Sequence, residues 1–290
     1  MFSSKFNSNS KVLIIGKDAG SANIISSFVK KKKIKALYHL KKPALEIFKK
    51  KKILIKKNTL NILSKNFDLL ITGTSHSNRF ELNAIKKAKN NNIYSVSFLD
   101  HWVNYKERFL LKNEFIFPNE IIVGDIDAYS LAKKNFRNKK VLVSLIPNYY
   151  FKEKRKIKNR KKNKETLVLL SSNFNSRNEG LKDKLIFRLI LNKMKKFIIT
   201  KNIKKIIIKM HPSEDKKKFK NFKVDYQIFG FIKIEITNKT LEEVLKKNQF
   251  IVGFNTMGLV IAKLFNCNTF NLKIRGIKST IPKKYIDNVL

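Results

Sequence analysis

Short apolar runs alternate with longer amphipathic stretches along almost the whole chain, and this alternation constrains the fold more than any other feature. The runs are rich in Ile, Leu, Val and Phe and end in Gly, Asn, Asp or Ser. Such runs predict buried strands, and helical stretches between them predict the crossovers of a parallel sheet. The sequence therefore predicts an α/β protein. In the first half we expect strands at residues 11–16, 36–40, 68–73, 94–99, 121–124 and 141–145. We expect one helix that ends near residue 33 and further helices at residues 44–52, 78–90 and 128–135.

The alternation is interrupted once, by a charge run at residues 151–164 that has hardly any apolar residue. We interpret this run as a basic linker between two domains, since 290 residues can form two separate cores. The predicted domains are residues 1–150 and 165–290, both Rossmann-like, with mostly parallel sheets, facing each other across a cleft. In the second half we expect strands at residues 166–172, 205–210, 250–254 and 269–272, and helices at 181–200, 241–247 and 257–265.

The formal charge of +43, from 64 Lys and Arg against 21 Asp and Glu, raises the question of an anionic partner. Nucleic acid is not the partner we expect, because the lysines are scattered over every segment and no zinc-finger or aromatic RNA-binding motif is present. A peripheral contact with an anionic membrane is easier to explain physically. The runs that could make it are Lys30–Lys33, Lys49–Lys52 and residues 152–164.

Nothing in the sequence predicts a membrane span or a secretory leader. No apolar stretch reaches the ~20 residues that a span needs, and the first ten residues are polar. The single cysteine, Cys267, cannot form an intramolecular disulfide or a cysteine metal cluster, so we expect it to pack in a core. We expect a cytoplasmic protein, at most attached to the inner face of the cytoplasmic membrane.

Polar residues that directly follow a predicted strand are the first candidates for a site, because ligands of open α/β sheets bind at the carboxyl ends of the strands. Asp18, Gly20 and Ser21 follow the opening strand. Gly20 and Ser21 could form a turn whose N–H groups bind an anion or a sugar hydroxyl, and Asp18 could act as a base. The alternative is that Asp18 and Ser21 only cap the next helix.

Two further loops of the first half carry polar groups. Residues 73–77 (GTSHS) are explained as well by a helix cap as by a site. The segment from Asp100 to Phe109 is denser in polar and aromatic side chains than a cap requires, and it contains the only tryptophan. Asp100 and His101 could supply a general acid or base, and Arg108 a fixed cation for a phosphate or carboxylate. Trp102 could instead simply pack.

In the second half, a predicted strand leads directly into Lys209, His211 and Pro212. Proline stiffens the turn and so holds the imidazole in one direction. A later strand ends at Gly253 and is followed by Asn255 and Thr256 at a predicted helix start, where a hydroxyl, backbone N–H groups and the helix dipole favour a phosphate. Together these two segments predict an anion site.

These two segments, Lys209–Pro212 and Gly253–Thr256 with Ala262, resemble the K-x-H-P and G-x-x-S/T motifs of GT-B glycosyltransferases that build bacterial surface polysaccharides such as capsule and lipopolysaccharide. The most similar groups are the polysialyltransferases, the Kdo-transferases and the CDP-glycerol glycerophosphotransferases. The resemblance implies transfer of a sugar or polyol phosphate from a nucleotide donor to a glycan or lipid-linked acceptor. It also implies that no metal or other cofactor is required.

The resemblance assigns roles to individual residues. The donor-binding set that it implies is Lys209, His211, Pro212, Ser171, Ser172, Gly253, Asn255 and Thr256. The catalytic candidates in the first domain are Asp18, Asp100 and His101, without a choice between the two aspartates as base. Gly20, Ser21 and Arg108 are candidates for contacts with the acceptor or a phosphate.

Besides nucleic-acid binding, two other functions remain open at this stage. A UDP-N-acetylhexosamine 2-epimerase would also have two facing Rossmann-like domains, but it needs several carboxylates around the sugar, and we expect few in the strand-end loops of this chain. A catalytically inactive GT-B protein that only binds a nucleotide or an anionic glycan is the other alternative.

Overall fold

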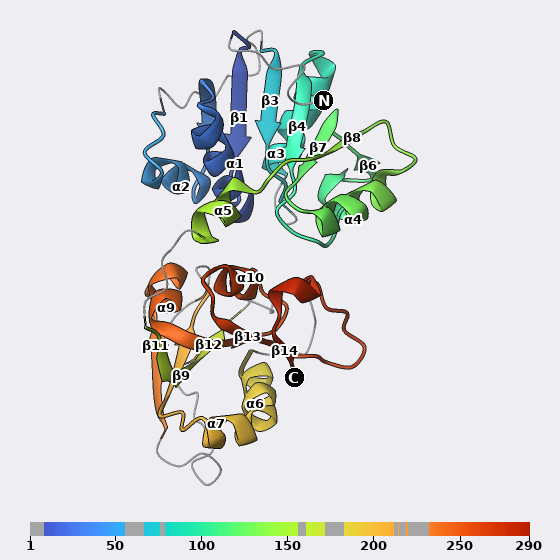
Figure 1. Ribbon diagram of the computed structural model, residues 1–290. Coiled ribbons are helices and arrows are strands. Elements are labelled where there is room, and N and C mark those ends of the chain that lie inside the picture. Colours follow the sequence, from blue (N-terminus) through green and yellow to red (C-terminus); the bar gives the residue numbers. More distant parts are fainter. Residues whose placement is uncertain are drawn as a thin grey trace. The chain divides into compact units, whose positions relative to one another are not determined.

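The computed structural model describes residues 9–55, 67–75, 79–155, 161–171, 183–211, 214, 219 and 232–290. The chain divides into two compact units, Met1–Lys152 and Glu153–Leu290. Each unit contains one six-stranded sheet whose recorded strand pairs are all parallel (Figure 1). The predicted α/β class with two Rossmann-like domains is confirmed.

The sheet of the first unit has the order β2-β1-β3-β4-β7-β8. The direction of strand addition reverses between β1 and β3, and such a switch point is where ligands bind in this class of sheet. The elements are β1 Val12–Gly16, α1 Ala19–Lys32, β2 Ala36–Leu40, α2 Ala44–Lys50, β3 Leu69–Thr72, α3 Phe80–Asn90, β4 Tyr94–Phe98, the 3-10 turn η2 Glu107–Phe109, the hairpin β5 Leu110–Leu111 and β6 Glu114–Phe115, β7 Glu120–Val123, α4 Ile126–Phe136, β8 Leu142–Leu145 and α5 Tyr149–Arg155.

Strand β1 explains how this unit is layered. Its residues alternate between two hydrophobic clusters: Val12 and Ile14 pack with Phe28 of α1, whereas Leu13 and Ile15 pack with Ala84 and other residues of α3. Helices therefore cover both faces of the sheet, which is why the strand is apolar at every position rather than at every second one. The layers place the starts of α1 and α3 next to the carboxyl end of β1.

The sheet of the second unit has the order β11-β10-β9-β12-β13-β14. Counted along the chain this is 3-2-1-4-5-6, the order of dinucleotide-binding folds, with its switch point between β9 and β12. The elements are β9 Asn163–Leu170, α6 Asp183–Lys193, α7 Lys195–Thr200, β10 Lys205–Lys209, β11 Lys233–Thr237, α9 Leu241–Lys247, β12 Asn248–Gly253, α10 Met257–Leu264, β13 Asn268–Asn271, the 3-10 turn η5 Lys283–Tyr285 and β14 Asn288–Val289.

Several local predictions differ from the structure. The helix expected at residues 181–200 is two helices, α6 and α7, because Met194 leaves helical geometry at φ −91° and ψ 4°. Within the predicted linker, residues 151–155 belong to α5, residues 156–160 lie outside the described residues, and β9 already begins at Asn163. The elements that the sequence prediction missed are the β5–β6 hairpin, α5, β11 and β14.

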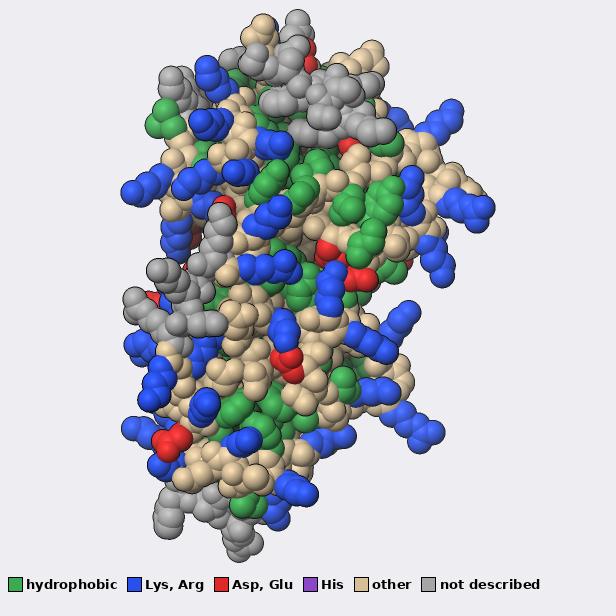
Figure 2. Space-filling model, in the orientation of Figure 1, with side chains coloured by type: hydrophobic (Ala, Val, Ile, Leu, Met, Phe, Trp, Pro, Cys, Tyr) green, Lys and Arg blue, Asp and Glu red, His purple; other side chains and the backbone are tan. Residues whose placement is uncertain are grey.

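The surface carries the large positive charge. Lys and Arg side chains are spread over the visible face of both units with few acidic side chains among them (Figure 2). Within the described part of the chain, no helix is long and apolar enough to cross a membrane.

Candidate functional site

Asp18 lies directly after β1, at the switch point of the first sheet, and is the N-cap of α1. Its carboxylate Oδ2 accepts a hydrogen bond from the backbone N–H of Gly20 at 3.1 Å. The hydroxyl of Ser21 donates to the Asp18 carbonyl at 3.4 Å and is buried against Gly73, where a Cβ would lie only 2.1 Å from the Ser21 Oγ. The capping function foreseen for Asp18 is present, and Ser21 packs against the loop that follows β3.

Asp100 and Arg108 form a buried ion pair at the end of β4. The distance from Arg108 Nη1 to Asp100 Oδ1 is 2.8 Å. The same Nη1 donates to the carbonyl and hydroxyl oxygens of Thr74, at 3.3 and 3.2 Å, and Nε donates to the Val103 carbonyl at 3.2 Å. Arg108 is only 7% exposed. Arg108 is a fixed cation whose partner in this structure is Asp100. Its contact with a phosphate stays a prediction.

The Asp18 carboxyl has a perturbed proton affinity. Burial raises its pKa from 3.8 to about 6, and the nearby charges of Asp100 and then Glu81 act in the same direction. The Gly20 N–H and Arg108 act in the opposite direction, but the effects that raise the pKa are larger. A carboxyl group with a pKa near the working pH is suited to accept and return a proton. This property distinguishes Asp18 from an ordinary helix cap.

Glu81 completes an acidic cluster with Asp18 and Asp100, and the sequence analysis missed it. It lies in the first turn of α3 and is 1% exposed. Its Oε1 accepts hydrogen bonds from the backbone N–H groups of Lys17, at 2.8 Å, and Asp18, at 3.4 Å. Helix α3 therefore adds one carboxylate to the two that the strand-end loops supply. The only available signal was a single Glu inside a predicted helix that follows a polar strand-end loop.

His101 and Trp102 hold the loop after β4. His101 Nδ1 accepts a hydrogen bond from the Trp102 backbone N–H at 3.1 Å, and the imidazole is partly exposed. The buried Trp102 donates through its indole N–H to Asp125, the N-cap of α4, at 3.3 Å. Trp102 is a packing residue, as the alternative interpretation held, and it fixes the loop that carries Asp100.

In the second unit, Ser171 and His211 follow β9 and β10 and are joined by a carboxylate. Glu214 accepts from the Ser171 hydroxyl at 2.7 Å through Oε1 and from the His211 backbone N–H at 2.8 Å through Oε2. Ser171 is buried, whereas His211 is exposed. Glu214 was not foreseen. The predicted donor-site residues Ser172 and Pro212 lie outside the described residues.

Lys209 is the last residue of β10 and is 9% exposed. Its ammonium group donates to the carbonyl of Met210. Burial lowers its pKa, while the charge of Glu214 acts in the opposite direction. A buried cation therefore lies beside the Glu214 carboxylate at the carboxyl edge of this sheet.

Gly253, Asn255 and Thr256 connect β12 to α10. Thr256 is the N-cap of α10, and its hydroxyl accepts from the Gly258 N–H at 3.3 Å. Asn255 has a left-handed backbone, with φ of 47°. Its amide accepts from the Thr280 N–H at 3.2 Å and donates to the Lys278 carbonyl at 3.3 Å, so it holds the chain after β13 against this turn. Gly253 is required because a Cβ would lie 2.9 Å from the Thr256 methyl group.

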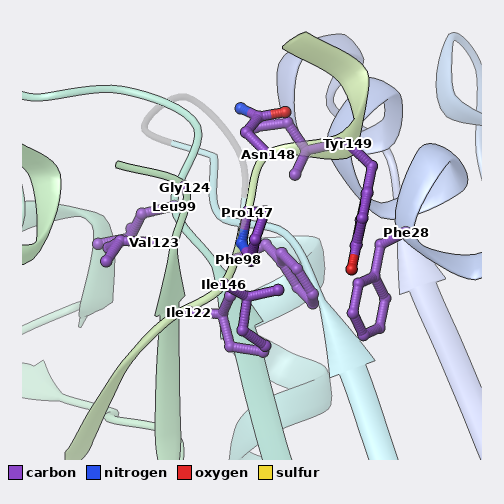
Figure 3. A pocket seen from close by; sticks show the side chains of 11 residues that line it. Phe28, Phe98, Leu99, Ile122, Val123, Gly124, Ile146, Pro147, Asn148 and Tyr149 are labelled. Atoms are coloured by element: carbon purple, nitrogen blue, oxygen red, sulfur yellow. The ribbon is translucent and has the colours of Figure 1, made fainter. Parts of the chain in front are cut away.

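A small cavity in the first unit lies beside β4, β7 and β8 (Figure 3). Its walls are mainly apolar, and its volume of about 10 Å³ is enough for at most about one water molecule. It is too small for a nucleotide or a sugar, and Phe28 with Phe98 and Tyr149 forms part of its wall (Figure 3). We interpret it as a packing gap.

No group of three His, Cys, Asp or Glu side chains in the described part of the chain is arranged to hold a metal ion. The expectation that catalysis requires no metal stays a prediction, which an activity assay must test.

No protein-family model matches this chain, and no curated protein matches it in sequence. Solved structures are similar in fold. The UDP complex of Staphylococcus aureus MnaA has a TM-score of 0.61 and 14% identity, over 91% of this chain and 79% of that one. The UDP-GlcNAc 2-epimerase of Neisseria meningitidis bound to UDP-GlcNAc has a TM-score of 0.59 and 12% identity, over 91% and 82%. These similarities show the GT-B fold.

Proposed function

We propose that this chain is a glycosyltransferase that takes a sugar from a nucleotide donor, with Asp18 as the base that accepts the proton of the acceptor hydroxyl. The observation that carries the proposal is the Asp18 carboxyl at the carboxyl end of β1, whose pKa is raised to about 6. The GT-B fold, in which the similar structures bind UDP or UDP-GlcNAc, supports a nucleotide-sugar substrate.

The ion pair supports Asp18 over Asp100 as the base. The Arg108 guanidinium lies 2.8 Å from Asp100, so the Asp100 carboxylate is already engaged in an ion pair. Asp100 instead places a negative charge beside Asp18, which increases the proton affinity of Asp18. We therefore give the two aspartates different roles, Asp18 as the base and Asp100 as a negative charge beside it, although both follow strands of the same sheet.

The second unit would bind the nucleotide. Loss of the diphosphate develops negative charge, and the start of α10 at Thr256 offers backbone N–H groups and a helix dipole to stabilise it. Glu214 would repel an anion placed at the His211 backbone. We therefore assign the phosphates to the Thr256 side, and the sugar or ribose hydroxyls to the side of His211 and Glu214, where Lys209 also lies.

A second candidate is a 2-epimerase acting on a UDP-N-acetylhexosamine. The specific observation in its favour is the cluster of Asp18, Glu81 and Asp100, because epimerisation at C2 requires one group that removes a proton and another that returns it. The similar solved structures named as 2-epimerases have the same fold. The two functions differ in whether the C2–H bond of the sugar breaks.

The deciding experiment is a proton NMR time course of the protein with UDP-GlcNAc in D₂O, followed by CMP-, CDP-, GDP- and ADP-sugars and a lipopolysaccharide or capsule oligosaccharide as acceptor. A transferase consumes one donor, releases its nucleotide and leaves the C2 proton intact. Loss of the C2 signal by exchange with deuterium would replace the proposal with the epimerase. Tight nucleotide binding without any turnover would instead show a binding protein.

Asp18→Asn tests the base. Asparagine also caps helices well, so the fold should be retained while turnover falls by about 10²- to 10⁴-fold, the usual contribution of a general base. The matched control is Asp125→Asn, because Asp125 caps α4 by accepting from the Ala128 N–H at 3.0 Å. Turnover that survives in Asp18→Asn would show that Asp18 is not the base.

A further inference from the structure

Glu81 is a buried carboxylate that the proposed reaction does not use. One of its oxygens accepts from the two consecutive backbone N–H groups of Lys17 and Asp18, across 64 and 63 residues of sequence. These N–H groups follow β1 directly, before α1 begins. Glu81 therefore fixes the start of the loop that carries the Asp18 side chain.

The second carboxylate oxygen of Glu81, Oε2, is buried without a hydrogen-bond partner. Leaving a buried carboxylate oxygen without a partner is costly for folding. A neutral glutamine in the same place could accept the same two N–H bonds through its amide oxygen. The backbone contacts alone thus do not explain why a carboxylate stands here.

We propose that Glu81 is a positioning residue for Asp18: it fixes the Lys17–Asp18 backbone, and its negative charge makes the Asp18 carboxylate a stronger proton acceptor. The catalytic use of this proton acceptor rests on the proposed function. The positional and electrostatic effect of Glu81 on Asp18 does not depend on the proposed function.

The charges that surround Asp18 support this assignment. They come from α3 (Glu81), from the end of β4 (Asp100) and from η2 (Arg108). Asp100 is neutralised in part by its ion pair with Arg108 at 2.8 Å, whereas Glu81 is held by backbone N–H groups and by its place in the first turn of α3. The two carboxylates together act against the single guanidinium, which favours the protonated form of Asp18.

The chain provides a matched control in Glu120, the first residue of β7. Glu120 is 0% exposed, and its Oε1 is also buried without a partner, while Oε2 accepts from the Tyr94 hydroxyl at 3.2 Å. It lies at the amino end of its strand, whereas Asp18 lies at the carboxyl end of β1. Glu81→Gln and Glu120→Gln remove the same charge from equally buried sites at opposite edges of one sheet.

The experiment is a pH titration of the full chain labelled with ¹³C at the aspartate carboxyl carbons, in which Asp18→Asn identifies the Asp18 signal. In Glu81→Gln we expect the titration midpoint of Asp18 to fall by roughly half a pH unit or more, the scale of one nearby like charge. In Glu120→Gln we expect no movement of that midpoint. If the chain is an active transferase, the acid limb of its kcat profile moves in the same direction in Glu81→Gln.

Two results would overturn the proposal: an unchanged Asp18 midpoint in Glu81→Gln, or an equal shift in Glu120→Gln. If Glu81→Gln does not fold, Glu81→Asp keeps the charge but withdraws it from the loop, and an unchanged midpoint with unchanged kcat would then reject the proposal. A chain without any turnover still gives the titration result. Failure of the proposed function and failure of this inference are therefore distinguishable.

Discussion

The carboxylate of Asp100 lies directly against the backbone of Gly20, so close that a Cβ on Gly20 would be 1.9 Å from Asp100 Oδ2. Gly20 lies in the first turn of α1, and its N–H already donates to Asp18. The absence of a side chain thus lets two carboxylates approach one helix start, where the backbone N–H groups favour negative charge. This contact ties the loop after β4 to the loop after β1.

Gly20→Ala should separate the two loops. The methyl group cannot share space with a carboxylate that Arg108 holds in place, so Asp100 or the start of α1 must move. We expect a loss of about 1–3 kcal/mol in the free energy of unfolding, the usual cost of overpacking. Urea unfolding followed by circular dichroism measures it, and catalytic turnover should fall as well.

Gly16→Ala is the matched control, since Gly16 ends β1 two residues before Asp18. The nearest atom to a Cβ there is Leu40 Cδ2 at 3.6 Å, an ordinary contact. If both alanine variants lose the same stability, the contact between Asp100 and Gly20 has no special importance.

Asp18 should make the folded chain less stable as the pH rises. Because its folded-state pKa of about 6 lies above the unfolded value of 3.8, the folded chain binds this proton more tightly, and stability falls between about pH 4 and pH 6. Asp18→Asn removes the ionisation but retains a capping side chain. We expect it to be more stable than the unmodified chain at pH 8, by up to about 3 kcal/mol, and equally stable near pH 4.

Thermal unfolding of both forms across this pH range measures the difference. A constant difference between pH 4 and pH 8 would mean that Asp18 titrates normally, and it would also remove the main support for Asp18 as the base.

The architecture could be predicted from the sequence because it follows from local patterns. Runs such as residues 12–16 are apolar at every position and are strands buried on both faces, as predicted. The missed elements lack such a signal. Strand β11 contains Lys233 and Glu235, its residues are mostly part-exposed, and it lies at the edge of its sheet. The break at Met194 interrupts a continuous helical pattern, and no proline or glycine marks it in the sequence.

The site could be predicted only in part, because its chemistry depends on contacts between distant segments. The strand-end rule found Asp18 and Asp100, but the raised pKa of Asp18 follows from burial and from the charges of Asp100 and Glu81, which no spacing reveals. Glu81 and Glu214 were missed for the same reason: each is a single acidic residue with a hydrogen-bond partner at the end of a distant strand. The predicted donor-binding role of Asn255 remains untested, and its amide already has partners at Thr280 and Lys278.

Breaking the ion pair of Arg108 should be more harmful than removing both partners. Arg108→Met leaves the Asp100 carboxylate largely buried without its cation, which typically costs about 3–5 kcal/mol. Adding Asp100→Leu removes the unpaired buried charge. The double variant should therefore lose about 1–3 kcal/mol less of its free energy of unfolding than the two single losses add up to. Chemical denaturation of the three variants measures this coupling energy. Strictly additive losses would show that Arg108 and Asp100 do not stabilise each other.

Thr256 should matter for nucleotide binding beyond its function as a helix cap, and Thr240 provides the comparison. Thr240 caps α9 by accepting from the Glu243 N–H at 3.3 Å, and Thr256 caps α10 by accepting from the Gly258 N–H at the same distance. Thr256→Val and Thr240→Val should each lose about 1 kcal/mol of stability, as lost caps do.

Only Thr256→Val should weaken nucleotide binding. The nucleotide to test is the one among CMP, CDP, UDP, GDP and ADP that stabilises the unmodified chain in a thermal-shift screen. We expect about a tenfold increase in Kd by calorimetry, the equivalent of one hydrogen bond to a charged phosphate. Equal weakening by both variants would mean that general stability, and not the start of α10, determines nucleotide binding.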